Sequence, residues 1–247
     1  WRGIGGAPPA GTSLQRRSIW ATLLLGLFLT LAFYGIVANV AGGPLPPVLR
    51  AVFGETPINA VIVFVFFVVV AELVELWLGL LRDRALLRGL GRHAGAAELR
   101  AHIEALPPEA RASPPAHRIL ARMAEGGTGP ASEIAAAEID DALSRAARRY
   151  IRALIVSLPL IGFTGTVIGI MASLEGLPAL LESVGAEGGL SAALSGTLGG
   201  LATAFQTTLL GLLASIVASL LLAALERAEA ATHAACDMLA TTSGRAG

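Results

Sequence analysis

The chain has 247 residues, and its 18 basic and 18 acidic side chains give a formal net charge of +0. Hydrophobic residues make up 54% of the sequence and charged residues only 15%, whereas a soluble domain carries about 25% charged residues. This composition argues against a soluble globular protein. We expect no nucleic-acid partner, because the arginines cluster beside apolar runs rather than on a soluble face.

Four apolar stretches are long enough to cross a hydrocarbon core, which takes about 20 residues of helix. They cover residues 18–40, 58–81, 150–174 and 198–225. The first is too long for a cleaved signal peptide, and a second follows it closely. The predicted fold class is all-α: a polytopic membrane protein with four transmembrane helices, the last two extended into the cytoplasm.

The arginines on either side of these stretches predict the orientation of the chain. Basic residues precede the first stretch, follow the second and lead into the third, whereas the loop 172–197 holds three glutamates and no basic residue. The loop 41–57 holds only Arg50 against Glu55. Because cytoplasmic loops carry the excess of basic residues, both termini and the segment 82–149 are predicted to be cytoplasmic.

The predicted organisation therefore has five parts. They are a cytoplasmic tail (1–17), two outer transmembrane helices (18–81), a cytoplasmic helical segment (82–149), two further transmembrane helices (150–225) and a cytoplasmic tail (226–247). Proline and glycine clusters divide the cytoplasmic segment into helices at about 83–105, 116–124 and 131–149. No helix breaker separates the last of these from the third stretch, so one helix is expected to continue into the membrane. The fourth stretch is likewise expected to continue to about Met238.

The cytoplasmic segment shows no sign of an enzyme. It is small and rich in alanine, and it has no phosphate-binding loop, metal-ligand spacing or nucleophile elbow. His93, His102 and His117 are expected on the surface, and the single Cys236 is expected to be incidental. No enzymatic activity, metal or cofactor is therefore predicted.

Small and hydroxyl residues recur at helical spacing in the third and fourth stretches. One set is Pro159, Gly162, Thr166, Gly169 and Ser173, and the other is Gly200, Ala204, Thr208, Gly211 and Ser215. Each set forms a narrow seam on one face of its helix. Such a seam fits close helix packing, with each threonine bonded to its own helix, and it equally fits a polar path through the membrane. Periodicity alone leaves both interpretations open.

Neither of these two stretches carries an acidic residue, a histidine or a lysine at mid-depth. A proton relay usually needs an ionisable group within the membrane. Glu72 and Glu75 in the second stretch lie near its cytoplasmic end, where snorkelling or ion pairing accounts for them. If the chain conducts protons, the titrating carboxylate must come from another polypeptide.

The second half of the chain resembles the MotA/TolQ/ExbB proton-channel family over about residues 142–225. The run Pro159-Leu-Ile-Gly-Phe-Thr-Gly-Thr-Val-Ile-Gly169 is similar to the family's core motif in one span. The run Thr208-Leu-Leu-Gly-Leu-Leu-Ala-Ser215 and its lead-in Ala204-Phe-Gln-Thr-Thr208 are similar to the next span. Two motifs in the right order and at the right distance make the resemblance fairly specific.

The resemblance implies a subunit of an ion-driven motor in the bacterial inner membrane. It implies a homopentamer around a dimer of an ExbD-, TolR- or MotB-like single-span partner, which supplies a membrane aspartate. The implied ion is H⁺ in preference to Na⁺, and the first two spans would form a lipid-facing outer layer. Thr166 and Thr208 would be the pore-side hydroxyls, with Thr164 and Thr207 as second choices. Pro159, Gly162, Gly169, Gly211 and Ser215 would serve helix packing or kinking.

The chain also departs from parts of the family. Two spans before the cytoplasmic segment resemble MotA rather than TolQ or ExbB, yet that segment is short and shows no counterpart of MotA's rotor-contacting charges. Two alternatives from other classes remain: a structural scaffold that oligomerises through the seams, and a secondary transporter. The transporter is disfavoured by the absence of an inverted repeat and of a midplane charge.

Overall fold

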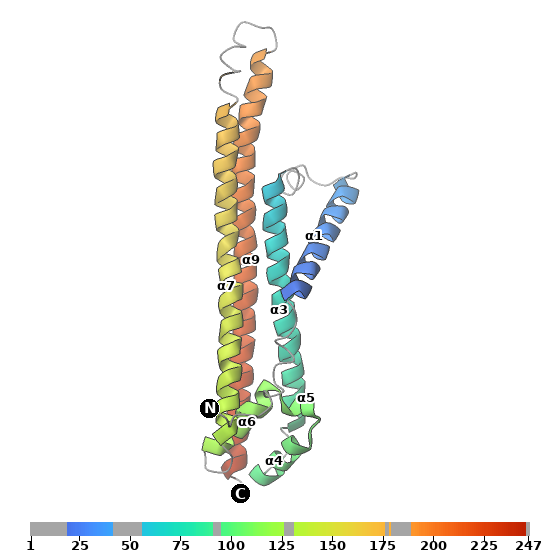
Figure 1. Ribbon diagram of the computed structural model, residues 1–247, viewed down its shortest axis with the longest axis vertical. Coiled ribbons are helices and arrows are strands. Elements are labelled where there is room, and N and C mark those ends of the chain that lie inside the picture. The colour runs from blue at the N-terminus through green and yellow to red at the C-terminus, as the bar shows by residue number, and fades with distance from the viewer. Residues whose placement is uncertain are drawn as a thin grey trace, which may run out of the picture. The chain divides into compact units, whose positions relative to one another are not determined.

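The computed structural model describes residues 19–41, 56–90, 95–125, 131–175, 178 and 189–245. Within these ranges the chain is all-α and has no strand, as predicted (Figure 1). The elements in chain order are α1 (Ile19–Ala41), α3 (Pro57–Leu90), α4 (Ala96–Ala105), α5 (Pro108–Arg111), α6 (Pro114–Glu125), α7 (Ala131–Glu175) and α9 (Gly189–Arg245). The predicted tail 1–17 lies outside the described residues, as do His93 and most of the two loops predicted outside the membrane.

Four helices, α1, α3, α7 and α9, are long and apolar enough to cross a membrane. The predicted multi-pass membrane protein is therefore confirmed. Helix α7 has 45 residues and continues without interruption from its charged first half into its apolar second half. Helix α9 has 57 residues and extends past Met238 to Arg245. Both predicted helix extensions are confirmed.

The predicted helix 83–105 is wrong as a single element. Helix α3 carries on from its apolar stretch to Leu90, and Gly95 has extended backbone angles and caps the separate α4. The short α5 was not predicted at all. Its first residue is Pro108, and α6 begins at Pro114. Proline is favoured in the first turn of a helix, so these prolines begin helices where we expected only breaks.

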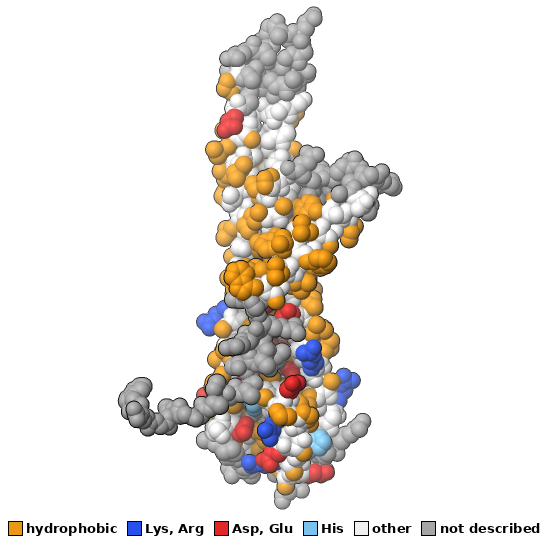
Figure 2. All heavy atoms as spheres, turned by 45° about the vertical axis from the view of Figure 1, so that its right-hand side comes forward, with side chains coloured by type: hydrophobic (Ala, Val, Ile, Leu, Met, Phe, Trp, Pro, Cys, Tyr) orange, Lys and Arg blue, Asp and Glu red, His pale blue; other side chains and the backbone are white. Residues whose placement is uncertain are grey.

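The described chain divides into two compact units. The membrane unit comprises the described residues within 20–72 and 151–221, and the polar unit comprises Ile19 and the described residues within 73–150 and 222–247. Figure 2 shows mainly hydrophobic side chains on the visible surface of the membrane unit and most of the charged side chains over the polar unit. In water such exposed apolar surface would be unfavourable, so the membrane unit is built for lipid or for neighbouring helices.

In the membrane unit, α1 packs on α3 through a small residue. A methyl group at Gly26 would lie 2.5 Å from Cγ2 and 3.2 Å from Cα of Val68, so a larger residue there would force Val68 to shift. The rings of Phe33 and Phe67 lie 5.7 Å apart between centroids. The Thr30 hydroxyl donates to the Gly26 carbonyl oxygen at 2.7 Å and is thereby satisfied within its own helix.

The polar unit has a hydrophobic core of its own, to which α3, α4, α6 and α9 contribute. Leu90, Leu99, Ile103, Ile119 and Cys236 are all buried to at least 99%. Cys236 is therefore a core residue rather than an incidental surface thiol. Helix α6 presents one apolar face to this core and its charged side chains to α7 and α9.

Replacing Ile119 by alanine is expected to destabilise the polar unit by about 2–5 kcal/mol, because a fully buried side chain would leave a cavity. Ile139→Ala, at a half-exposed position on α7, is the matched control and should cost much less. Thermal unfolding of the detergent-solubilised protein measures both. Equal losses of stability would mean that α6 does not pack on this core.

Candidate functional site

The apolar halves of α7 and α9 pack together through glycines that permit backbone contact. A methyl group at Gly169 would lie 2.6 Å from the Gly200 carbonyl oxygen, and one at Gly211 would lie 2.6 Å from the Leu158 carbonyl oxygen. A methyl group at Gly162 would lie 2.8 Å from the Thr207 carbonyl oxygen. These distances are too short for any side chain. The two predicted seams therefore face each other within one chain (Figure 1).

A pair of hydroxyls lies inside this contact. Thr166 of α7 and Thr208 of α9 are hydrogen-bonded through their Oγ1 atoms. The Thr166 hydroxyl is also 3.2 Å from the Ala204 carbonyl oxygen, and the Thr208 hydroxyl is 3.3 Å from the Gly162 carbonyl oxygen. Two donor hydrogens thus serve several acceptor oxygens, which leaves lone pairs available to a further donor. Both threonines are half-buried.

The two second-choice threonines lie in different surroundings. Thr207 is fully buried, and its hydroxyl donates to the Ala204 carbonyl oxygen at 3.0 Å. Thr164 is exposed, and its hydroxyl donates to the Leu160 carbonyl oxygen of its own helix at 3.0 Å. Neither joins the Thr166–Thr208 pair. The Thr164 side chain is exposed on the surface of the single chain, whereas the Thr207 side chain is packed between α7 and α9.

The remaining residues of the seams are spread along the same pair of helices. Pro159 is half-buried within α7, which continues through it. Ser173 is buried, and its hydroxyl is 2.9 Å from the Thr197 carbonyl oxygen of α9. Ser215 is half-buried. Proline has no N–H to donate, so one backbone carbonyl oxygen in the preceding turn lacks its usual helical hydrogen bond.

Gly165 belongs to the contact but was not among the predicted site residues. A methyl group at Gly165 would lie 2.5 Å from the Thr207 hydroxyl oxygen and 2.6 Å from its Cβ. The seam chosen from the sequence passes through Gly162 and Thr166 and leaves Gly165 beside it. Its spacing of three residues from Gly162 and four from Gly169 was the signal that could have identified it.

The faces of α7 and α9 turned away from this contact are strongly apolar. Large side chains there are between about 40% and 70% exposed in the single chain. On α7 they include Leu160, Phe163 and Val167, and on α9 they include Phe205, Leu212 and Leu220. The hydroxyl pair thus lies between two helix segments whose outward faces are mainly apolar.

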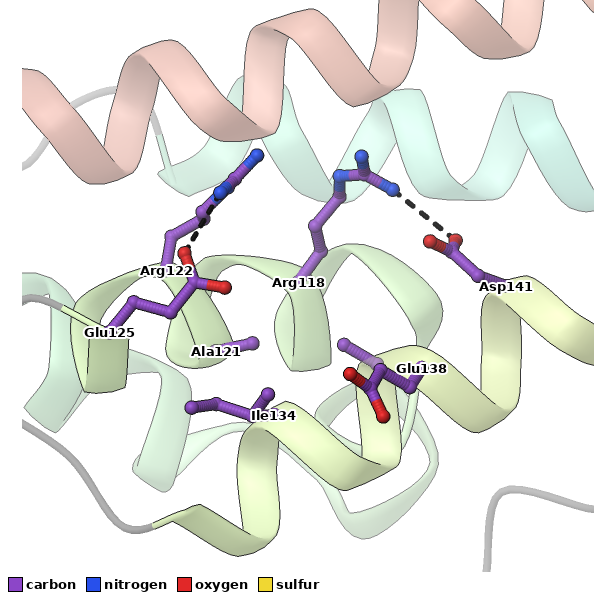
Figure 3. A pocket seen from close by; sticks show the side chains of 8 residues that line it. Arg118, Ala121, Arg122, Glu125, Ile134, Glu138 and Asp141 are labelled. Atoms are coloured by element: carbon purple, nitrogen blue, oxygen red, sulfur yellow. Dashed lines mark hydrogen bonds and ion pairs between the residues drawn. The ribbon is translucent and has the colours of Figure 1, made fainter.

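A second candidate is a small cavity of about 150 Å³ between α6 and α7 in the polar unit (Figure 3). Nη1 of Arg118 lies 3.3 Å from Oδ1 of Asp141, and Nη1 of Arg122 lies 2.8 Å from Oε2 of Glu125. Both arginines also pair with Asp237 of α9. Since acidic partners already neutralise both guanidinium groups, the cavity is not an anion site. The described residues contain no cluster of side chains that could hold a metal ion.

The comparison with family models concerns the segment that contains the α7–α9 contact. The model described as the MotA/TolQ/ExbB proton channel family matches residues 116–238. This segment is a MotA/TolQ/ExbB family domain. The resemblance predicted from the two motifs is confirmed, and the matched region is longer at both ends than the one we recognised. No curated protein and no solved structure matches the chain.

The MotA/TolQ/ExbB domain begins in α6 and ends in α9, so it includes both seams and the Thr166–Thr208 pair. It also includes the ion pairs that join α6 to α7 and α9 in the polar unit. Helices α1, α3 and α4 lie outside the match. The family describes a proton channel, which is a transport function rather than that of a typical enzyme.

Proposed function

We propose that this chain is the proton-conducting subunit of a membrane motor driven by an ion-motive force. Five copies surround the single-span helices of a partner dimer in the bacterial inner membrane, with both termini in the cytoplasm. Proton flow through the assembly drives rotation or force on a load. The ion is H⁺ in preference to Na⁺.

The Thr166–Thr208 pair is the observation that carries this proposal. It lies within the family domain, and it lies between helix segments that are otherwise apolar. A hydroxyl can both donate and accept a hydrogen bond, so the pair can accept a hydrogen bond from a water, and a hydroxyl that turns away from its backbone carbonyl can donate to a carboxylate. Lipid can do neither at this depth. Neither threonine has to gain or lose a proton to form these hydrogen bonds.

The titrating group must then come from the partner. Residues 153–174 and 189–225 contain no Asp, Glu, His, Lys or Arg. A partner aspartate fills this gap: when charged it favours the hydroxyl pair or water, and when neutral it can pass the apolar faces of the helices. Alternation between these two states would couple protonation to relative movement of the subunits.

The test is to co-express the chain with single-span proteins that carry a membrane aspartate. The purified assembly would be weighed by native mass spectrometry and reconstituted in liposomes with an imposed membrane potential. We expect five copies with two partners, and proton flux that disappears when the partner aspartate is replaced by asparagine. Proton flux through the chain alone would contradict the proposal, because a pathway would then exist without the partner carboxylate.

A structural scaffold is the second candidate, and one observation favours it. The two seams face each other in a single chain, and the two hydroxyls bond each other as well as backbone carbonyls. A closed oligomer with no central helices and no flux with any such partner would establish this function instead. The same mass measurement and flux assay therefore distinguish the two candidates.

A further inference from the structure

His117 joins α6 to α7 in the polar unit, contrary to its predicted place on the surface. Its Nδ1 lies 2.7 Å from Oδ2 of Asp140, and the two side chains are only 15% and 17% exposed. His102, in contrast, is exposed as predicted. A charged imidazole forms an ion pair with the Asp140 carboxylate, whereas a neutral imidazole keeps at most the hydrogen bond. The strength of the contact between His117 and Asp140 therefore depends on whether the imidazole is protonated.

The groups around this link come from four helices and are mainly acidic. Asp140 and Glu133 of α7 both act on His117. Asp83 of α3 interacts electrostatically with Asp140 and with Glu229 of α9. The remaining charges pair elsewhere: Arg148 with Glu229, Arg118 with Asp141 and Asp237, and His233 with Glu229. A proton on His117 thus adds a positive charge to an acidic region.

The groups around His117 also determine whether a rise in pH strengthens or weakens its contact with Asp140. The hydrogen bond to Asp140 raises the pKa of His117 above its ordinary value, and the charges of Asp140 and Glu133 act in the same sense against partial burial. A histidine whose pKa is raised by folding stabilises the folded state fully below its unfolded pKa of about 6.5. That contribution is lost as the pH rises through the higher pKa of the folded state.

We propose that His117 and Asp140 form a pH-dependent latch, which holds α6 on α7 while His117 carries a proton and weakens when His117 loses it. The latch controls access to the core of the polar unit, because the other face of α6 covers that core through Ile119 and its neighbours. It does not depend on the proposed proton-channel function, since all of its residues lie in the polar unit.

The chain carries its own reporter for this opening. Cys236 is the single cysteine of the sequence, is fully buried, and belongs to the same core cluster as Ile119. A thiol reagent can modify it only when the cover over the core opens. The labelling rate of Cys236 in the detergent-solubilised full chain therefore measures the population of the open state.

The experiment compares variants at each pH between 6.5 and 8.5, so that the intrinsic reactivity of the thiol cancels. In His117→Gln the side chain at position 117 is uncharged at every pH, while the Asp140 carboxylate stays in place. We expect this variant to be labelled several-fold faster than the unmodified protein at pH 6.5 and at the same rate at pH 8.5. His102→Gln is the matched control and should give a ratio of one throughout. Repeating the series with His233→Gln removes the imidazole that lies beside Glu229.

A ratio for His117→Gln that stays constant from pH 6.5 to 8.5 would overturn the latch. If that variant loses its helical structure, Asp140→Asn provides the same test, because His117 then loses its charged partner without a change of shape. Hydrogen exchange of residues 114–125 in the unmodified protein gives an independent answer. After correction for intrinsic exchange, protection should fall as the pH rises, and unchanged protection would also overturn the proposal.

Discussion

Replacing Thr166 and Thr208 together by valine is expected to reduce proton flux about tenfold or more, while the assembly still forms. Valine matches the shape of threonine but lacks its hydroxyl. A hydrogen bond to a charged group is worth about 1.5–3 kcal/mol, which corresponds to a tenfold or larger change in rate if it is made as the ion passes. The measurement is potential-driven flux in liposomes, beside native mass spectrometry of the same preparation.

Serine at both positions is the matched control, because it keeps the hydroxyls and removes only methyl groups. Flux in the serine variant should remain close to that of the unmodified assembly. Normal flux in the valine variant would show that the Thr166–Thr208 pair is a packing contact, as the scaffold interpretation holds. Loss of the oligomer in the valine variant would show that the pair is needed for assembly before any transport.

Gly169→Ala is expected to destabilise the membrane unit by about 1–3 kcal/mol or more, the usual range for overpacking. The added methyl group would lie 2.6 Å from the Gly200 carbonyl oxygen and 2.8 Å from the Ala204 backbone nitrogen. Backbone atoms cannot rotate away as a flexible side chain can, so the two helices must separate. Thermal unfolding in detergent measures the loss, and the Thr166–Thr208 bond should lengthen with it.

Gly199→Ala provides the control for this prediction. Gly199 lies in α9 near Gly200, but a methyl group there would meet nothing within 4 Å. Since alanine is the better helix former by about 1 kcal/mol in a solvated helix, this change should be neutral or mildly stabilising. Equal stability of the two variants would mean that α7 and α9 do not meet at Gly169.

The apolar helices could be predicted from the sequence because length and hydropathy are local properties. The same reasoning identified the seams through Gly162 and Gly169. It did not identify the partner of each seam, because this depends on the rotation and relative height of two helices whose contacting residues, such as Thr166 and Thr208, are 42 positions apart. The close contact of Gly165 with Thr207 is a product of that geometry.

The polar unit was harder to predict for a related reason. His117 and Asp140 are 23 residues apart, and Cys236 reaches the core from the last helix of the chain. No periodic pattern in one segment reports such pairings. The prolines also misled us: Pro108 and Pro114 suggested breaks, but each stands in the first turn of a helix, where its missing N–H carries no penalty.

The absence of ionisable residues from 153–174 and 189–225 has a consequence for the cell. A permeating ion needs a charged or strongly polar resting point in the bilayer, and these two segments offer it no charge. Surplus copies made before any partner is available would therefore leave the membrane potential intact. On the proposed function, leakage would be avoided because the conducting chemistry is divided between two polypeptides, neither of which would conduct protons by itself.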